Sequence, residues 1–172
     1  MKRITISFGL LSGAIIIVYT CAVFMVFGDF SHISLKQFKM LETLGYLRYI
    51  ILLLTVFFAM RTFKKQNEPP VKYWPLVKQN IMVIIVVAVC IGIMEYVYFL
   101  LNPDFFETYG HMYAQQLKIS GATTRELSNA QHEMNNYKWM QSPVMMGIFY
   151  FFETFAIGGV ASLILARFLK TK

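Results

Sequence analysis

The chain has few charged residues for its length. Only 15% of its 172 residues are Asp, Glu, Lys or Arg, whereas 57% are hydrophobic and 16% are aromatic. In soluble domains about a quarter of the residues are usually charged, because the surface in contact with water is rich in charged side chains. The shortage of charge therefore excludes an ordinary soluble domain and favours a protein whose solvent is lipid.

The sequence signals of metal, cofactor and catalytic sites are also missing. The two cysteines, Cys21 and Cys90, fall inside apolar runs and are typical of small buried hydrophobic residues. His32, His111 and His132 have neither an i, i+4 partner nor a cysteine partner, which favours surface histidines over metal ligands. No glycine-rich phosphate loop, dinucleotide fingerprint or Ser–His–Asp arrangement is present. We expect no metal, no cofactor and no enzymatic activity.

Four long apolar stretches are present instead, at about 5–27, 42–63, 78–101 and 143–169. Each is close to the ~20 residues that a helix needs to cross a bilayer. The third is rich in β-branched residues, but a single strand cannot satisfy its backbone in lipid, so a helix is predicted there too. The first stretch is too long for the apolar core of a signal peptide and is interpreted as a retained span. We predict an all-α membrane protein, with residues 1–172 forming one four-helix domain.

The segments between the spans differ in character. Residues 28–41 are predicted to form a short loop, and residues 64–77 a second loop in which Pro69, Pro70 and Pro75 should prevent a helix. The segment 102–142 is predicted to be an amphipathic helical hairpin. Asn102 and Pro103 look like the cap and first position of its first helix.

The second hairpin helix is marked by its own start signal. Gly121 should end the first helix, and Thr123 with Glu126 forms a capping-box pattern that should begin the second. Small residues recur at four-residue steps within three of the spans, a spacing that lets helices approach closely in membranes. These predicted helix-packing residues are Gly9, Gly13, Ala88, Gly92, Gly158, Ser162 and Ala166.

The distribution of Lys and Arg predicts the orientation. The net charge is +7, but the basic residues flank apolar segments and form no single tract, which argues against a nucleic-acid partner. The two ends and the 64–77 loop, together with Arg61 and Lys78 that flank this loop, hold ten of them, and the opposite side holds five. Because positive residues are enriched on the cytoplasmic side, both termini should be cytoplasmic and the hairpin extracytoplasmic.

Three charged residues lie deep inside the spans, away from the span ends. From the helical rise, Arg48 and Glu95 lie ~9 Å deep and Glu153 lies ~15 Å deep, all in the outer half. An unpaired charge near the bilayer centre costs at least ~2.5–3.5 kcal/mol. We therefore predict that Arg48 pairs with Glu95, Glu153 or both. This polar cluster is either a pocket for an ion, proton or small ligand, or a structural ion pair that fixes helix register.

Several short motifs resemble a known family. They are Gly45-Tyr46-Leu47 at the start of span two, Asn102-Pro103-Asp104-Phe105 after span three, Lys118 to Thr123 at the hairpin turn, the approach from Met134 to Pro143, and Glu153. The chain is similar, nearly end to end, to the four-span membrane proteins of domain-of-unknown-function family 4199, found mainly in Bacteroidetes. The resemblance implies a bacterial inner-membrane location and brings no activity, cofactor or catalytic residue.

Two functions fit these features. The first is a non-enzymatic accessory or scaffold subunit, in contact with the lipid bilayer and with a protein partner or further copies of itself. The alternative is an oligomeric transporter component for an ion, a proton or a small molecule, which would use Arg48, Glu95 and Glu153. A membrane enzyme with a lipid substrate is a third reading.

Overall fold

The computed structural model describes residues 2–26, 35–67, 70–136 and 141–170. These residues form six helices and no strand: α1 (Lys2–Val26), α2 (Leu35–Gln66), α3 (Tyr73–Leu101), α4 (Phe105–Ile119), α5 (Thr124–Asn136) and α6 (Pro143–Leu169). Helices α1, α2, α3 and α6 are long and apolar enough to cross a membrane. The prediction of four spans is confirmed, and the chain has the build of a multi-pass membrane protein.

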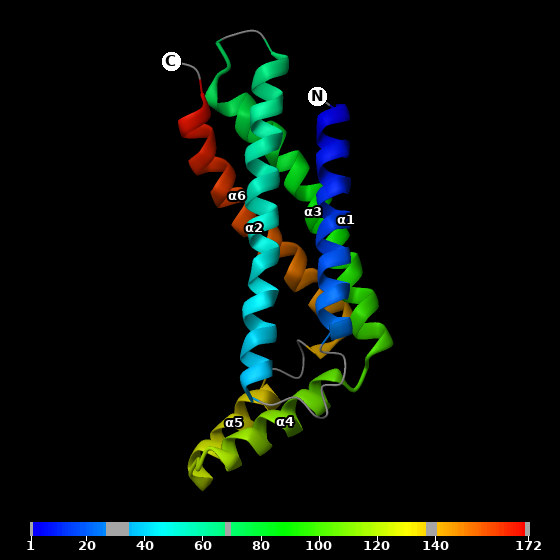
Figure 1. Cartoon of the computed structure of the whole chain (residues 1–172), viewed down its shortest axis with the longest axis vertical. Coiled ribbons are helices and arrows are strands. Elements are labelled where there is room, and N and C mark those ends of the chain that lie inside the picture. The colour runs from blue at the N-terminus through cyan, green and yellow to red at the C-terminus, as the bar shows by residue number, and fades with distance from the viewer. Residues whose placement is uncertain (1, 27–34, 68–69, 137–140, 171–172) are drawn as a thin grey trace.

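The four long helices form one bundle, and the short helices lie at one end of it. Both chain ends lie together at one end, which we call the terminal end, and α4 and α5 lie at the other, the hairpin end (Figure 1). Helix α3 contacts α1, α2 and α6, with its most extensive contact to α6. The helices α4 and α5 pack against each other as a hairpin, as the sequence predicted.

Two of the spanning helices begin earlier than predicted. Helix α2 begins at Leu35 instead of Glu42 and runs to Gln66 instead of Phe63. Lys36 and Lys39 therefore lie in a helix and not in the predicted 28–41 loop. Lysine is a good helix former, so charge at the edge of a membrane does not end a helix. Helix α3 begins at Tyr73 instead of Lys78, with Pro75 in its first turn. The expectation that Pro75 prevents a helix was wrong, because the first backbone N–H groups of a helix need no intrahelical acceptor.

The hairpin start also differs from the prediction. Asn102 caps the end of α3, where its backbone N–H and side-chain amide both donate to Tyr98 O, at 3.0 and 2.8 Å. It is not the N-cap of α4, which begins two residues beyond Pro103. The last carbonyl groups of a helix lack intrahelical donors, and Asn102 supplies two donors to one of them, Tyr98 O.

The turn of the hairpin follows the sequence signals. Gly121 has a φ of +80°, in the left-handed region that glycine adopts without strain. The capping box is present, because Glu126 Oε2 accepts from the backbone N–H of Thr123 at 2.7 Å and Glu126 N–H donates to Thr123 Oγ1 at 3.3 Å. Tyr137 and Trp139, near the end of the segment 102–142 that is predicted to form the hairpin, lie outside the described residues.

The bundle is held by an apolar interior with polar cross-links between helices. Its central layer combines fully or nearly fully buried side chains from all four spans: Ile16, Leu52, Val56, Ile84, Val87, Ile91 and Ala161. Gln79 donates to Thr5 Oγ1 at 2.8 Å, and Asn80 donates to Val56 O at 2.9 Å, which ties α3 to α1 and to α2. Such bonds matter in lipid, where the hydrophobic effect does not drive helices together.

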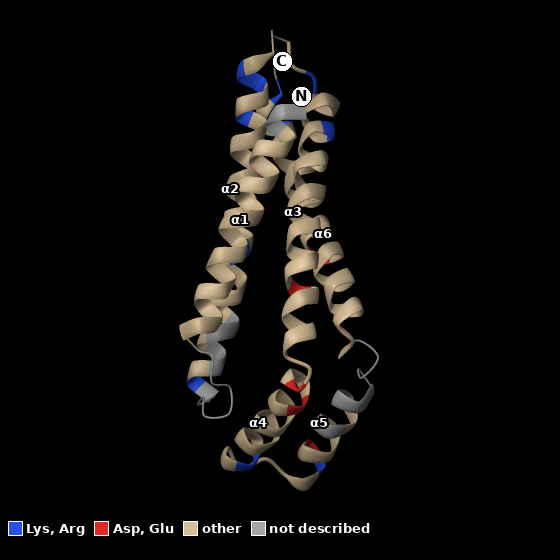
Figure 2. Ribbon diagram, turned by 90° about the vertical axis from the view of Figure 1, so that its right-hand side faces the viewer, with Lys and Arg blue, Asp and Glu red and all other residues tan. Residues whose placement is uncertain are grey.

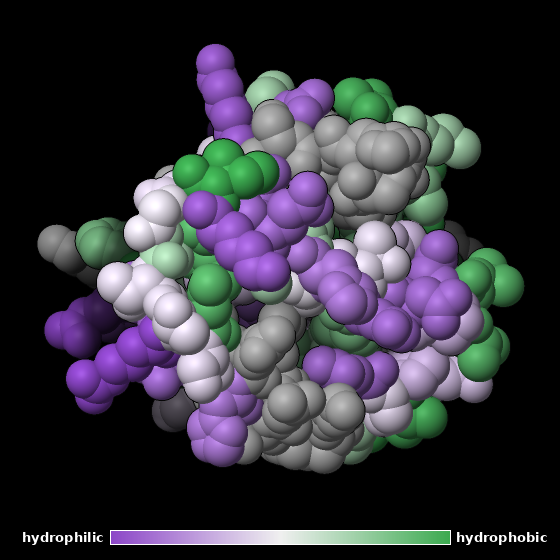
Figure 3. All heavy atoms as spheres, turned by 90° about the horizontal axis from the view of Figure 1, so that it is seen from below, coloured by the Kyte–Doolittle hydropathy of each residue, from purple (hydrophilic) through white to green (hydrophobic). Residues whose placement is uncertain are grey.

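Charge is unevenly distributed along the bundle. The terminal end is rich in Lys and Arg, whereas Asp and Glu appear within the spans and on the hairpin (Figure 2). Viewed onto the hairpin end, hydrophilic residues cover much of the face and hydrophobic residues gather mainly toward its rim (Figure 3). Along the spans, large apolar side chains such as Val18, Ile93 and Val160 are more than half exposed, as lipid-facing residues must be.

Candidate functional site

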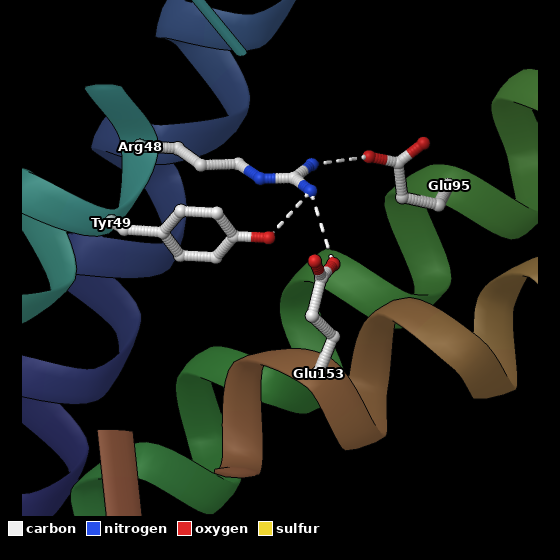
Figure 4. Close-up of polar contacts among 4 residues, drawn as sticks. All are labelled: Arg48, Tyr49, Glu95 and Glu153. Carbon is white, nitrogen blue, oxygen red and sulfur yellow. Dashed lines mark hydrogen bonds and ion pairs between the residues drawn. The ribbon is translucent and has the colours of Figure 1, made fainter. Parts of the chain in front are cut away.

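Three spans bring the intramembrane charges together. Arg48 on α2 donates from Nη1 to Glu95 Oε1 on α3 at 3.1 Å, and from Nη2 to Glu153 Oε2 on α6 at 3.2 Å (Figure 4). The guanidinium thus bridges two carboxylates from two helices and does not form a bidentate pair with either one. We call Arg48, Glu95 and Glu153 the triad. The structure brings together all three charges that the sequence placed inside the spans.

Two tyrosines complete the surroundings of the guanidinium. Arg48 Nη2 also donates to Tyr49 OH at 2.9 Å. Its Cζ atom lies 5.0 Å from the centre of the Tyr49 ring and 4.6 Å from that of Tyr150, within the range of cation–π attraction. Arg48 Nε is buried and has no hydrogen-bond partner among the described residues. The arginine is therefore held by its terminal nitrogens and by ring faces.

The three members of the triad differ in exposure. The side chain of Glu95 is 4% exposed and that of Arg48 is 14% exposed, whereas that of Glu153 is 28% exposed. Removing one member of such a buried group costs about 3–5 kcal/mol, because it leaves an uncompensated charge. The Arg48–Glu95 pair is therefore the fixed part of the site, and Glu153 is the more accessible part.

A cavity of about 370 Å³ opens beside the triad at the hairpin end of the bundle. Four spans and α4 contribute to its wall, and ten of its seventeen lining residues are aromatic, so most of its surface is apolar. The aromatic residues are Tyr19, Phe24, Tyr46, Tyr49, Phe99, Phe105, Phe106, Tyr109, Phe149 and Tyr150. The triad supplies the charged residues of the wall. This combination of apolar walls and a few convergent polar groups is typical of small-molecule sites.

The first hairpin helix forms part of the cavity wall. Phe105, Phe106 and Tyr109 line the cavity, and the Phe106 ring stacks on Phe99 of α3 with centroids 5.1 Å apart. The sequence predicted an apolar side for this helix but not what it covers. The structure shows that its N-terminal half lies against the bundle. A second hollow lies at the hairpin turn, away from the triad, and is lined by residues such as Ser120 and Asn129.

The structure places the small residues singled out in the sequence at close helix contacts. A Cβ atom built on Gly9 would lie 2.6 Å from Val86 Cβ, and one on Gly13 would lie 2.8 Å from Cys90 Cβ, which puts α1 directly against α3. On Gly158 it would lie 2.9 Å from Ile84 Cγ2. Ala88, Ser162 and Ala166 are fully buried.

The predicted packing residue Gly92 has a partner, Gly147, that was not predicted. A Cβ atom on Gly92 of α3 would lie 2.9 Å from Gly147 O of α6, and one on Gly147 would lie 2.8 Å from Gly92 O. The backbones of α3 and α6 touch here, close to the triad, because neither residue has a side chain. Gly147 stands eleven residues before Gly158, outside the four-residue stripe, so the stripe pattern passed over it.

Sequence reasoning also missed the tyrosines around Arg48. Tyr49 is adjacent to Arg48, and Tyr150 precedes Glu153 by one helical turn and so shares its face. The position of these tyrosines beside the intramembrane charges is a signal present in the sequence, but they carry no charge themselves. Within the described ranges, no group of three His, Cys, Asp or Glu residues is arranged to hold a metal ion. His111 Nε2 lies 3.7 Å from Oε1 of the exposed Glu107, one helical turn away.

Comparison with known proteins gives a family without an assigned activity. The model of the family described as "Protein of unknown function (DUF4199)" matches residues 7–171. No curated protein and no solved structure matches the chain. Because the family model covers nearly the whole length, the chain belongs to this family.

Proposed function

We propose that this member of the family of unknown function binds a small amphiphilic molecule in the cavity at the hairpin end. The observation that carries the proposal is a cavity of about 370 Å³ whose wall is mostly aromatic and includes the buried triad. Small-molecule sites are commonly of about 300–1,000 Å³, with apolar walls and a few polar groups that fix the orientation of the ligand. This is the small-molecule form of the transporter-component hypothesis.

The layer of side chains beneath the triad favours a closed binding site and argues against an open pore. One helical turn toward the terminal end from Arg48 and Glu95 lie Leu52 and Ile91, which are 1% and 2% exposed. Ile16 lies in the same relation to the cavity residues of α1 and is fully buried. A dry layer of this kind stops water and ions. The ligand therefore enters from the hairpin end and does not pass straight through.

The proposal includes a location. We place the protein in a bacterial inner membrane with both termini in the cytoplasm, because Lys and Arg gather at the terminal end. The cavity then takes its ligand from the extracytoplasmic side or from the outer leaflet.

A cavity-filling substitution tests the proposal. Gly45 lines the cavity, and a Cβ atom there would meet nothing within 4 Å, so Gly45→Leu should fold normally and occupy ligand space. Gly159→Leu is the matched control, because a Cβ atom on Gly159 meets only Ile81 Cδ1, at 4.0 Å, and Gly159 does not line the cavity. Both substitutions add the same side chain to a spanning helix.

The measurement is thermal unfolding in lipid nanodiscs with small aromatic probes of positive, negative and zero charge. A bound ligand at about a hundredfold over its Kd stabilises the folded state by about 2.7 kcal/mol. At least one probe should stabilise the wild type and Gly159→Leu but not Gly45→Leu. If every probe acts equally on all three proteins, the cavity is not a binding site.

A scaffold role remains the second candidate. Helix α5 packs chiefly on α4 and projects beyond the spans, which leaves a polar helical surface for a protein partner (Figures 1 and 3). Purification in mild detergent should then yield a stoichiometric partner or a defined homo-oligomer. Purification as a monomer without any partner would contradict this role and would leave the ligand-binding proposal intact.

A further inference from the structure

The charges of the triad do not balance. One guanidinium faces two carboxylates, so the fully ionised triad carries a net charge of −1. Among the residues that the structure describes, no other Lys or Arg lines the cavity. A net charge away from water is costly in a membrane, and it favours a positive partner.

The exposed acid is the one that can receive that partner. Glu95 is almost fully buried and accepts from Arg48 Nη1, so its charge is already matched. Glu153 also accepts from Arg48, through Oε2, but its side chain is 28% exposed where it lines the cavity. The surplus negative charge therefore reaches the ligand through Glu153.

We propose that the ligand is an organic monocation with an aromatic or aliphatic body, and that Glu153 is its counter-ion. This inference rests on the proposed function, since it assigns a ligand class to the same cavity. The apolar walls suit the body of such a molecule, and ring faces attract organic cations. A positive head beside Glu153 brings the net charge of the triad and ligand together to zero.

The same geometry disfavours an anion. The two terminal nitrogens of Arg48 already donate to Glu95, Glu153 and Tyr49. An anionic head that accepted from a remaining N–H group of Arg48 would still approach two carboxylates, which repel it. A metal ion is also disfavoured, because the described residues contain no group of three His, Cys, Asp or Glu residues that could hold one.

Three probes of similar size separate the possibilities. Phenyltrimethylammonium is a cation, tert-butylbenzene is its uncharged isostere, and benzoate is an aromatic anion. Equilibrium dialysis against protein in nanodiscs gives the affinity of each, with empty nanodiscs as the blank for partition into lipid. The wild type should bind the cation about tenfold or more tightly than the isostere, as one desolvated cation contact supports.

Two Glu→Gln variants test the counter-ion. Glu153→Gln should remove the preference for the cation, whereas Glu107→Gln should keep it. The control removes the same charge from an exposed hairpin residue that does not line the cavity. Full cation preference in Glu153→Gln would overturn the assignment of Glu153. If Glu153→Gln does not fold, the ratio of cation affinity to isostere affinity in the wild type decides the ligand class on its own.

The outcomes separate the ligand class from the existence of the site. Equal binding of cation and isostere, or stronger binding of benzoate, would overturn the ligand class. The proposed function would stand in that case if Gly45→Leu abolished the binding. Binding of no probe above the empty-nanodisc blank would overturn both.

Discussion

Replacing Arg48 with leucine is the sharpest perturbation of the triad. The substitution makes α2 more apolar, so it should favour the membrane if Arg48 had only a lipid-facing or snorkelling role. In the structure, however, Arg48 is the shared donor to Glu95 and Glu153, at 3.1 and 3.2 Å. Its loss strands two carboxylates inside the bundle. We therefore expect Arg48→Leu to destabilise the protein.

The magnitude follows from the burial of the partners. Breaking a buried ion pair by removing one member costs about 3–5 kcal/mol. Glu95 is 4% exposed and falls fully within this range, whereas Glu153 is 28% exposed and contributes less. A stranded carboxylate reduces the loss by taking up a proton. The expected loss is therefore at the lower end, about 3 kcal/mol of the free energy of unfolding.

A set of combined variants isolates the interaction. Adding Glu95→Gln to Arg48→Leu should recover part of the stability, and adding Glu153→Gln as well should bring it within about 1 kcal/mol of the wild type. Arg61→Leu is the matched control, because Arg61 lies on the same helix and is exposed, so its change should stay within about 0.5 kcal/mol.

Reversible unfolding in mixed micelles measures these free energies. The pairing would be refuted if Arg48→Leu alone stabilised the protein. It would also be refuted if the effects of Arg48→Leu and Glu95→Gln simply added, with a coupling energy below about 0.5 kcal/mol.

Three further predictions follow from other parts of the molecule. Gly92→Ala should lower the free energy of unfolding by about 1–3 kcal/mol, as overpacking does, because its Cβ would meet backbone of α6 at 2.9 Å; Gly159→Ala, which has room, should leave it unchanged in the same measurement. The backbone N–H of Thr123 lowers the pKa of Glu126. This stabilisation is present above the unfolded-state pKa of Glu126 and is lost as the pH falls through its folded-state pKa. The protection factors of amides in the first turn of α5, after correction for the intrinsic pH dependence of exchange, should therefore fall on acidification, and unchanged protection factors would contradict it. In a variant lacking both native cysteines, a cysteine at Lys65 should resist an impermeant thiol reagent in intact cells and one at Asn129 should react; the reverse labelling would invert the orientation.

The fold class was available from the sequence because membrane spans are a property of composition over about 20 residues. No tertiary contact is needed to recognise four apolar runs, or to see that the turn needs Gly121 and the capping box of Thr123 and Glu126. Those features arise from neighbouring residues. The errors at Leu35, Pro75 and Asn102 occurred where polar residues follow or precede a span, because local signals there do not separate the end of a helix from the edge of the membrane.

The triad was partly within reach of the sequence. Helical rise gave similar depths for Arg48, Glu95 and Glu153, and the cost of lone charges in lipid required a partner. Depth alone does not tell which face of each helix is turned inward. That is decided by packing, above all by the glycine contacts that set α3 against α1 and α6.

Only the tertiary structure decided that there is a cavity. It arises because Gly45 leaves space, because aromatic residues from five helices converge, and because α4 folds back against α3 through Phe106 and Phe99. Each of these is a contact between residues far apart in the chain, and no periodicity in the sequence encodes it. The sequence by itself determined that the chain crosses a membrane and carries charge inside it. The packing of the helices determined that this charge borders a space with room for a ligand.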